Sequence, residues 1–205
     1  MTGWSAATAA RAEEILARYP DRRSAVMPLL YLAMLEDGAL TTAGMRTVAG
    51  YTGLTPVQVE AVASFYTMYK AAPLGRYLIS VCTAISCMLN GADEVFAAVE
   101  AETGAHDGET DQDGTFTVEH VECIGACGGA PAAQVNYEMV EGLDPGRARS
   151  LCRWLRESSP RLIVADELQE LFGGRRSFPA GPPDPEGAIA PVPAWGPYGS
   201  AGRPS

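Results

Sequence analysis

The 205-residue sequence has little positive charge. It contains one lysine, Lys70, and only 15 lysine and arginine residues in total, against 25 aspartate and glutamate residues, so its formal net charge is −10. Binding to nucleic-acid phosphates needs a concentrated basic surface. The arginines here are scattered, and Arg22-Arg23 and Arg175-Arg176 are the only adjacent pairs. The composition therefore argues against nucleic acid as a partner.

Long apolar runs and nucleotide-binding motifs are also absent from the sequence. No apolar segment approaches the roughly 20 residues that cross a bilayer, and no basic segment followed by an apolar one marks a secretory signal. We therefore expect a cytoplasmic protein with no direct membrane insertion. No G-x-G-x-x-G follows a predicted strand and no P-loop occurs, so the sequence shows no recognisable nucleotide-binding loop.

Apolar periodicity and composition divide the chain into three regions, which together predict an α+β protein. Residues 10–72 are predicted to form a helical N-terminal domain. Residues 75–172 alternate strand and helix, which predicts a thioredoxin-like α/β domain. Residues 173–205 hold seven of the 22 glycines and eight of the 15 prolines. Such a segment buries too little apolar surface to offset its ordering entropy, so we expect a flexible tail.

The same patterns predict individual elements. Helices are expected over 13–19, 24–37, 43–51, 92–102 and 145–156, and strands over 77–81, 115–121, 132–135 and 138–140. One further helix has a clear start, because Thr55 can cap it, Pro56 fits its first position and Gln58 completes a capping box. Val57 and Phe65 lie on an apolar stripe of this helix, together with Ala61, Val62, Tyr66 and Tyr69. We interpret the stripe as core between helices.

Four of the five cysteines form two pairs, Cys82-x4-Cys87 and Cys123-x3-Cys127, with 35 residues between the pairs. Each pair follows a predicted strand, in a loop of small residues that lets backbone amides approach the sulfurs. Four thiolates can hold either a [2Fe–2S] cluster or a zinc ion. Zinc sites usually contain C-x2-C, which neither pair has, so the spacing favours iron–sulfur without excluding zinc. Disulfides fit a reducing compartment poorly.

The remaining candidate residues receive structural interpretations. Cys152 is predicted to be a buried thiol on a helix. His120 lies near Cys123, but four cysteines already complete a ligand set. Asp111 and Asp113 imitate the start of a calcium-binding loop, yet its twelfth position falls on His120 instead of glutamate. A thiol–disulfide oxidoreductase is disfavoured because the chain has no C-x-x-C pair.

At the two cysteine loops the chain resembles a known family. The matching segments are Cys82-Thr83-Ala84-Ile85-Ser86-Cys87-Met88-Leu89, Glu122-Cys123-Ile124-Gly125-Ala126-Cys127 followed by Ala130-Pro131, and Ser64-Phe65-Tyr66-Thr67-Met68-Tyr69. They resemble the thioredoxin-like [2Fe–2S] subunit, known as the E subunit, of the proton-pumping NADH:quinone oxidoreductase, respiratory complex I. The departures are small: many relatives have proline where Ser86 stands, and a bulkier residue and asparagine where Gly128-Gly129 stand.

The resemblance implies one [2Fe–2S] cluster held by Cys82, Cys87, Cys123 and Cys127 in a non-catalytic electron-transfer subunit. It implies two partners: an NADH-binding flavoprotein subunit, which carries FMN and NADH, and the large Fe–S subunit of complex I. The cluster would take one electron from the flavin, and the helical N-terminal region would dock on the partner. The complex would lie peripherally on the cytoplasmic face of the inner membrane. A small diaphorase subunit of an NAD-linked hydrogenase or formate dehydrogenase is the alternative.

Overall fold

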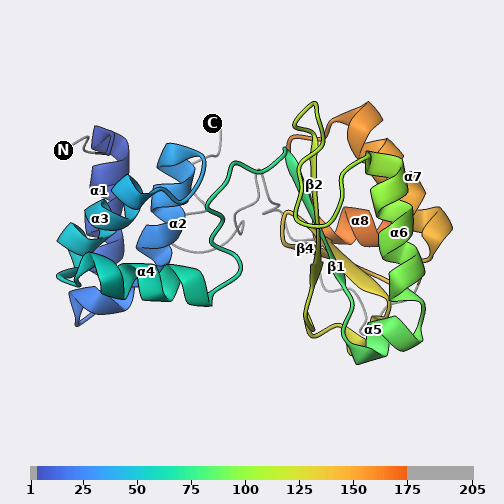
Figure 1. Cartoon of the computed structure of the whole chain (residues 1–205), viewed down its shortest axis with the longest axis horizontal. Helices are drawn as coiled ribbons and strands as arrows, with labels where there is room; N and C mark the ends of the chain where they lie inside the picture. The colour runs from blue at the N-terminus through green and yellow to red at the C-terminus, as the bar shows by residue number, and fades with distance from the viewer. Residues whose placement is uncertain (1–3, 175–205) are drawn as a thin grey trace. The chain divides into compact units, whose positions relative to one another are not determined.

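The computed structural model of the chain describes residues 4–174, so the predicted tail over 175–205 lies outside the described residues. The described backbone divides into two compact units, residues 4–73 and residues 74–174. The first is entirely helical and the second combines helices with one sheet (Figure 1). The α+β class predicted from the sequence is confirmed. Among the described residues, no helix is both long and apolar enough to span a membrane.

The helical unit is built around α2, which packs against the other three α-helices of the unit. Leu29 and Leu30 on α2 are completely buried, as are Val48 on α3 and Val59 on α4. These apolar side chains form a core that the polar faces of the helices enclose. The elements are α1 (Ala6–Leu16), the 3-10 turn η1 (Arg22–Ala25), α2 (Val26–Asp37), α3 (Thr42–Thr52) and α4 (Pro56–Phe65).

The helix caps explain where two of these helices begin. Thr55 caps α4, and the predicted capping box is confirmed: the Thr55 side chain accepts from the Gln58 N–H and the Gln58 side chain accepts from the Thr55 N–H. For α1 the prediction placed the start too late. Ser5 caps this helix by accepting from the N–H of Thr8, so the alanine-rich segment that follows is already helical.

The interpretation of the apolar stripe on α4 as core was wrong for Val57 and Phe65, although Tyr69, assigned to the same stripe, is buried. Val57 is 73% exposed and Phe65 is 77% exposed, whereas Val59 and Ala63 are buried. The ten residues of α4 carry apolar side chains on nearly every side, so two stripes at helical spacing compete for the core. Packing against α2 and α3 selects the stripe of Val59 and Ala63. The unit therefore presents an exposed apolar face on α4.

The second unit contains a four-stranded sheet in the order β2-β1-β3-β4. β1 and β2 are parallel, and β3 is antiparallel to both β1 and β4. This arrangement and the helices between the strands make the domain thioredoxin-like, as predicted. The elements are β1 (Tyr77–Cys82), α5 (Ile85–Leu89), α6 (Ala92–Thr103), β2 (Phe116–Val121), the 3-10 turn η2 (Cys127–Gly129), β3 (Ala132–Val135), β4 (Glu138–Glu141), α7 (Pro145–Ser158) and α8 (Ala165–Phe172).

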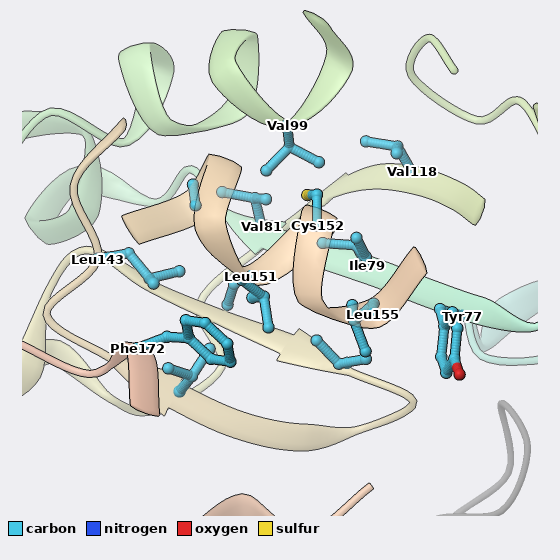
Figure 2. Packing of buried hydrophobic residues seen from close by; sticks show 14 of the residues in the cluster. Tyr77, Ile79, Val81, Val99, Val118, Leu143, Leu151, Cys152, Leu155 and Phe172 are labelled. Carbon is cyan, nitrogen blue, oxygen red and sulfur yellow. The ribbon is translucent and has the colours of Figure 1, made fainter. Parts of the chain in front are cut away.

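One core holds the sheet against its helices. Figure 2 shows Val99 of α6 and Leu151, Cys152 and Leu155 of α7 packed over the strands. Cys152 is 1% exposed, which confirms the prediction of a buried thiol. Two helices, α5 and α8, were not predicted. The first has only five residues, which is too short for a periodic pattern. In α8 the buried Leu168 and Phe172 are spaced i and i+4, a helical pattern that was present in the sequence and was overlooked.

Candidate metal centre

The parallel pairing of β1 and β2 brings the two cysteine loops to the same end of the sheet. In this register Cys82 lies beside Val121, and Cys123 follows Val121 by two residues. The pairing continues one step past β1, because the N–H of Thr83 donates to the carbonyl of Val121 at 3.0 Å. The two segments that follow β1 and β2 therefore leave the sheet side by side, and the first residues of the two cysteine loops are held close together.

The antiparallel strand β3 returns the second loop to the same place. Ala133 lies opposite Val81 near the end of β1, so η2, which precedes β3, also lies at this end. Cys82 and Cys87 pack here in a small cluster with Ala126, Ala130, Ala132 and Ala92, the first residue of α6. Ile124 and Met139 also pack against this cluster, but its buried members other than the cysteines are all alanines, which lets backbone amides approach the sulfurs.

The four thiols differ in exposure. Cys82 and Cys87 are each 2% exposed, whereas Cys123 and Cys127 are exposed at the surface. The Sγ atoms of Cys123 and Cys127 lie 3.6 Å apart. Gly125 between them has φ = 87°, a conformation that side-chain-bearing residues rarely adopt, and it turns the loop back on itself. All five cysteines are free thiols, so the two pairs are not disulfides.

The thiols also interact electrostatically. Burial above all, together with the neighbouring Cys82 and Cys127 thiols, raises the pKa of the Cys87 thiol to about 11, while the backbone N–H of Ala132 opposes the shift. A buried thiolate at this position is therefore costly unless cations compensate its charge. The N–H of Ala132 stabilises the ionised sulfur, as expected of a loop whose small residues let amides approach. The donor set suits soft metal ions that bind thiolate.

The arrangement of sulfurs bears on which metal centre fits. Two thiolates bound at about 2.3 Å to one tetrahedral metal are about 3.8 Å apart, close to the separation of Cys123 and Cys127. The second pair of thiols is therefore spaced as two ligands of one metal atom. Within residues 4–174, no group of three or more His, Cys, Asp or Glu side chains is already gathered closely enough to hold a metal ion.

Two neighbouring groups are occupied elsewhere. The Nδ1 atom of His120 lies 2.7 Å from a carboxylate oxygen of Asp107, and its ring packs edge-on against Phe96. Asp111 accepts hydrogen bonds from the backbone N–H groups of Thr115 and Phe116. The loop that contains Asp111 and Asp113 therefore organises the turn before β2. Both His120 and this loop have partners other than the thiols.

Some features of this end of the sheet were not predicted from the sequence. Ile85, Met88 and Leu89 form an exposed face of α5 next to the thiols, and Gly129 packs against the side chain of Glu141 on β4. Ile85, Met88 and Leu89 are spaced i, i+3 and i+4, but three positions within one five-residue helix are too few to predict the first feature from the sequence. The second depends on strand pairing and has no local signal.

Residues 12–156 match the family of thioredoxin-like [2Fe-2S] ferredoxins. The chain belongs to this family. The matched segment includes most of the helical unit as well as the sheet and both cysteine loops. Membership of this family implies that the chain carries an iron–sulfur cluster.

Individual relatives agree with this assignment. The NADH-quinone oxidoreductase E subunit of Mycobacterium tuberculosis is 47% identical over 150 residues, which are 73% of this chain and 60% of that protein. An NADH-quinone oxidoreductase E subunit of Rhizobium meliloti is 41% identical over 144 residues, 70% of this chain and 86% of the relative. NADH-quinone oxidoreductase subunit 2 of Thermus thermophilus is 41% identical over 147 residues, 70% of this chain and 81% of the relative.

Solved structures share the fold. An NAD+-reducing [NiFe]-hydrogenase in its H2-reduced state superposes with a TM-score of 0.59 at 23% identity. The matched region covers 72% of this chain and 25% of the hydrogenase chain. At this identity the similarity concerns the fold alone.

Proposed function

We propose that Cys82, Cys87, Cys123 and Cys127 hold one [2Fe–2S] cluster, and that the chain is an electron-transfer subunit in the NADH-oxidising module of a proton-pumping NADH:quinone oxidoreductase. It accepts one electron from the flavin of a partner flavoprotein subunit. The observation that carries the proposal is the convergence of both cysteine pairs at one end of the sheet. The 41–47% identity to NADH-quinone oxidoreductase subunits supports the assignment to that complex.

The division of labour follows from the chemistry of the donor. NADH delivers two electrons as a hydride, and a [2Fe–2S] centre supplies a site for only one electron, so a flavin has to intervene. This chain carries no recognisable dinucleotide-binding motif. NADH and FMN therefore belong to the partner, which must approach the cysteine end closely. The exposed positions of Cys123 and Cys127 suit such an approach.

The same geometry would serve a diaphorase subunit of an NAD-linked hydrogenase. An NAD+-reducing [NiFe]-hydrogenase has the same fold, but at 23% identity this similarity does not extend to function. The quinone oxidoreductase relatives are considerably more similar in sequence. Affinity purification of the tagged chain from its native host separates the two, because a hydrogenase subunit would co-purify with nickel and a quinone oxidoreductase subunit would not.

The proposed function is tested with the isolated chain and with its flavoprotein partner. The isolated, reconstituted chain should contain two iron and two sulfide per polypeptide, and NADH alone should not bleach its visible absorbance. Adding the flavoprotein should allow partial reduction by NADH, limited by the potential of the cluster. Rapid bleaching by NADH without the partner would contradict the proposal, because it requires a nucleotide site on this chain.

A further inference from the structure

The outer face of α5 is apolar and exposed, although the helix lies beside the thiols. Ile85 is 70% exposed, Met88 47% and Leu89 76%. These positions are spaced i, i+3 and i+4, so they share one face, while Cys87 is turned inward and buried. Single exposed apolar residues are common, but three on one turn form a contiguous patch and mark a contact surface.

The patch lies at the end of the sheet that holds the four thiols. α5 begins three residues after Cys82, and Ala92 at the start of α6 packs against Cys82 and Cys87. The exposed Cys123 and Cys127 belong to the same end. Any protein that exchanges an electron with these sulfurs has to contact this surface, and the apolar face of α5 is part of it.

The charge around the patch has one sign. Between Arg76 and Arg147 the sequence contains no lysine or arginine and 13 aspartate and glutamate residues. Three of them are exposed beside the cysteine loops: Asp93 and Glu94 in the first turn of α6, and Glu122 directly before Cys123. The two arginines that flank this segment have other partners: Arg76 donates to the carbonyl of Ser159, and Arg147 pairs with Asp144.

We infer that Ile85, Met88 and Leu89 are the apolar centre of the contact with the electron-donating flavoprotein, and that Asp93, Glu94 and Glu122 form an acidic rim for lysine and arginine residues of that partner. This inference rests on the proposed function and adds the chemistry of the partner's surface to it. The charge argues against a second copy of this chain as the occupant, because acidic rim would oppose acidic rim and be repelled, and the position beside the thiols favours the electron donor instead.

The two parts of the surface have different physical roles. Apolar side chains at the centre exclude water and slow dissociation, and losing such a contact costs affinity. The acidic rim attracts the partner before contact and mainly raises the association rate, an effect that falls with ionic strength. Electron uptake adds one negative charge at the cysteine end, so a basic partner surface also favours the reduced form.

The test compares paired variants of the full chain carrying its cluster, with the flavoprotein subunit of the same host as the probe. In the first pair, Ile85→Ser with Leu89→Ser should raise the dissociation constant on the order of tenfold or more. Leu162→Ser is the control. Leu162 is also exposed, at 39%, but it follows Pro160, whose carbonyl binds the Tyr77 hydroxyl at the opposite end of β1.

In the second pair, Asp93→Lys with Glu122→Lys should lower the association rate several-fold at low salt and flatten its dependence on ionic strength. Glu157→Lys changes charge by the same amount per residue near the end of α7, close to Ser159, which binds Arg76 before β1. It should have little effect. All four variants replace exposed residues. Their visible absorbance and iron content should therefore equal those of the parent chain.

The outcomes separate the inference from the proposed function. Equal affinity and equal salt dependence in all variants, with NADH reducing the cluster through the flavoprotein, would overturn the docking surface and leave the proposed function intact. A parent chain that binds no [2Fe–2S] cluster, or a cluster that the flavoprotein cannot reduce with NADH, would overturn the proposed function. Tighter binding after Asp93→Lys with Glu122→Lys would show that the partner's surface is acidic, which also overturns the inference.

Discussion

Gly129, two residues after Cys127, packs directly against the side chain of Glu141 on β4. A Cβ atom at Gly129 would lie 2.7 Å from the Cβ of Glu141 and would collide with its carboxylate. The contact is reinforced by the N–H of Gly142, which donates to the carbonyl of Gly129 at 2.6 Å. The second cysteine loop is therefore seated on the edge strand of the sheet, where only a glycine fits.

We predict that Gly129→Ala destabilises the fold and the metal centre together. Since the Cβ of Glu141 cannot move away as the end of a side chain can, the strand or the loop must shift, at a cost of about 1–3 kcal/mol. Denaturant unfolding and iron content measure both effects. Gly50→Ala is the matched control, because a Cβ atom added at Gly50 would have nothing within 4 Å. Alanine in helix α3 should raise the free energy of unfolding by about 0.5–1 kcal/mol.

Cysteine substitutions distinguish ligands from the core thiol. If the four loop cysteines are the ligands, as proposed, replacing any of them by serine should abolish or severely distort the cluster, because each sulfur then supplies one of four required bonds. Cys152→Ser should leave the cluster unchanged, since Cys152 lies in the core over the sheet. Iron and sulfide analysis and paramagnetic resonance of the reduced protein provide the measurement. A normal spectrum after Cys87→Ser would remove Cys87 from the ligand set.

The convergence of the cysteine loops was more predictable from sequence than the surface around them. The cysteine spacing and the strands before each loop are local features, and parallel pairing of β1 and β2 then brings Cys82 and Cys123 together. The role of Gly129 was not predictable, because Glu141 is twelve residues away and meets it only through the pairing of β3 with β4.

The helical unit shows what apolar periodicity can and cannot predict about a helix. The start of α4 was correctly predicted because Thr55 and Gln58 form their capping box within four residues. Its buried face was not, since Val57 and Val59 are equally apolar and only the neighbouring helices decide which of them is covered. A local signal thus located the helix, and tertiary packing chose its orientation.

The exposed face of α4 leads to a prediction about docking. If the helical unit contacts the flavoprotein, then Val57→Ser with Phe65→Ser should weaken that complex on the order of tenfold, because both side chains are more than two-thirds exposed and available to a partner. Cluster content should stay constant. Leu35→Ser on α2, 42% exposed, is the control. Unchanged affinity of the double variant would assign docking to the sheet-containing unit alone.

The buried thiol of Cys152 predicts a pH-dependent contribution to stability. Burial raises the pKa of Cys152 to about 12, from an ordinary value of 9.0, and the nearby Glu102 carboxylate adds to the shift. Below pH 9 the thiol is protonated in both folded and unfolded chains, so its packing contributes fully. Between pH 9 and pH 12 the unfolded chain loses this proton while the folded chain keeps it, and the contribution falls.

The measurement is the difference in unfolding free energy between the parent chain and Cys152→Ala, followed by denaturant titration from pH 7 to pH 11 under reducing conditions. At pH 7 the parent should be the more stable, because alanine leaves a small void beside Leu151 and Val99. Above pH 9 this advantage should shrink, at a slope approaching about 1.4 kcal/mol per pH unit. Lysine and tyrosine titrations are common to both chains and cancel in the difference. A difference that stays constant to pH 11 would mean that the Cys152 thiol ionises as easily in the folded core as in the unfolded chain.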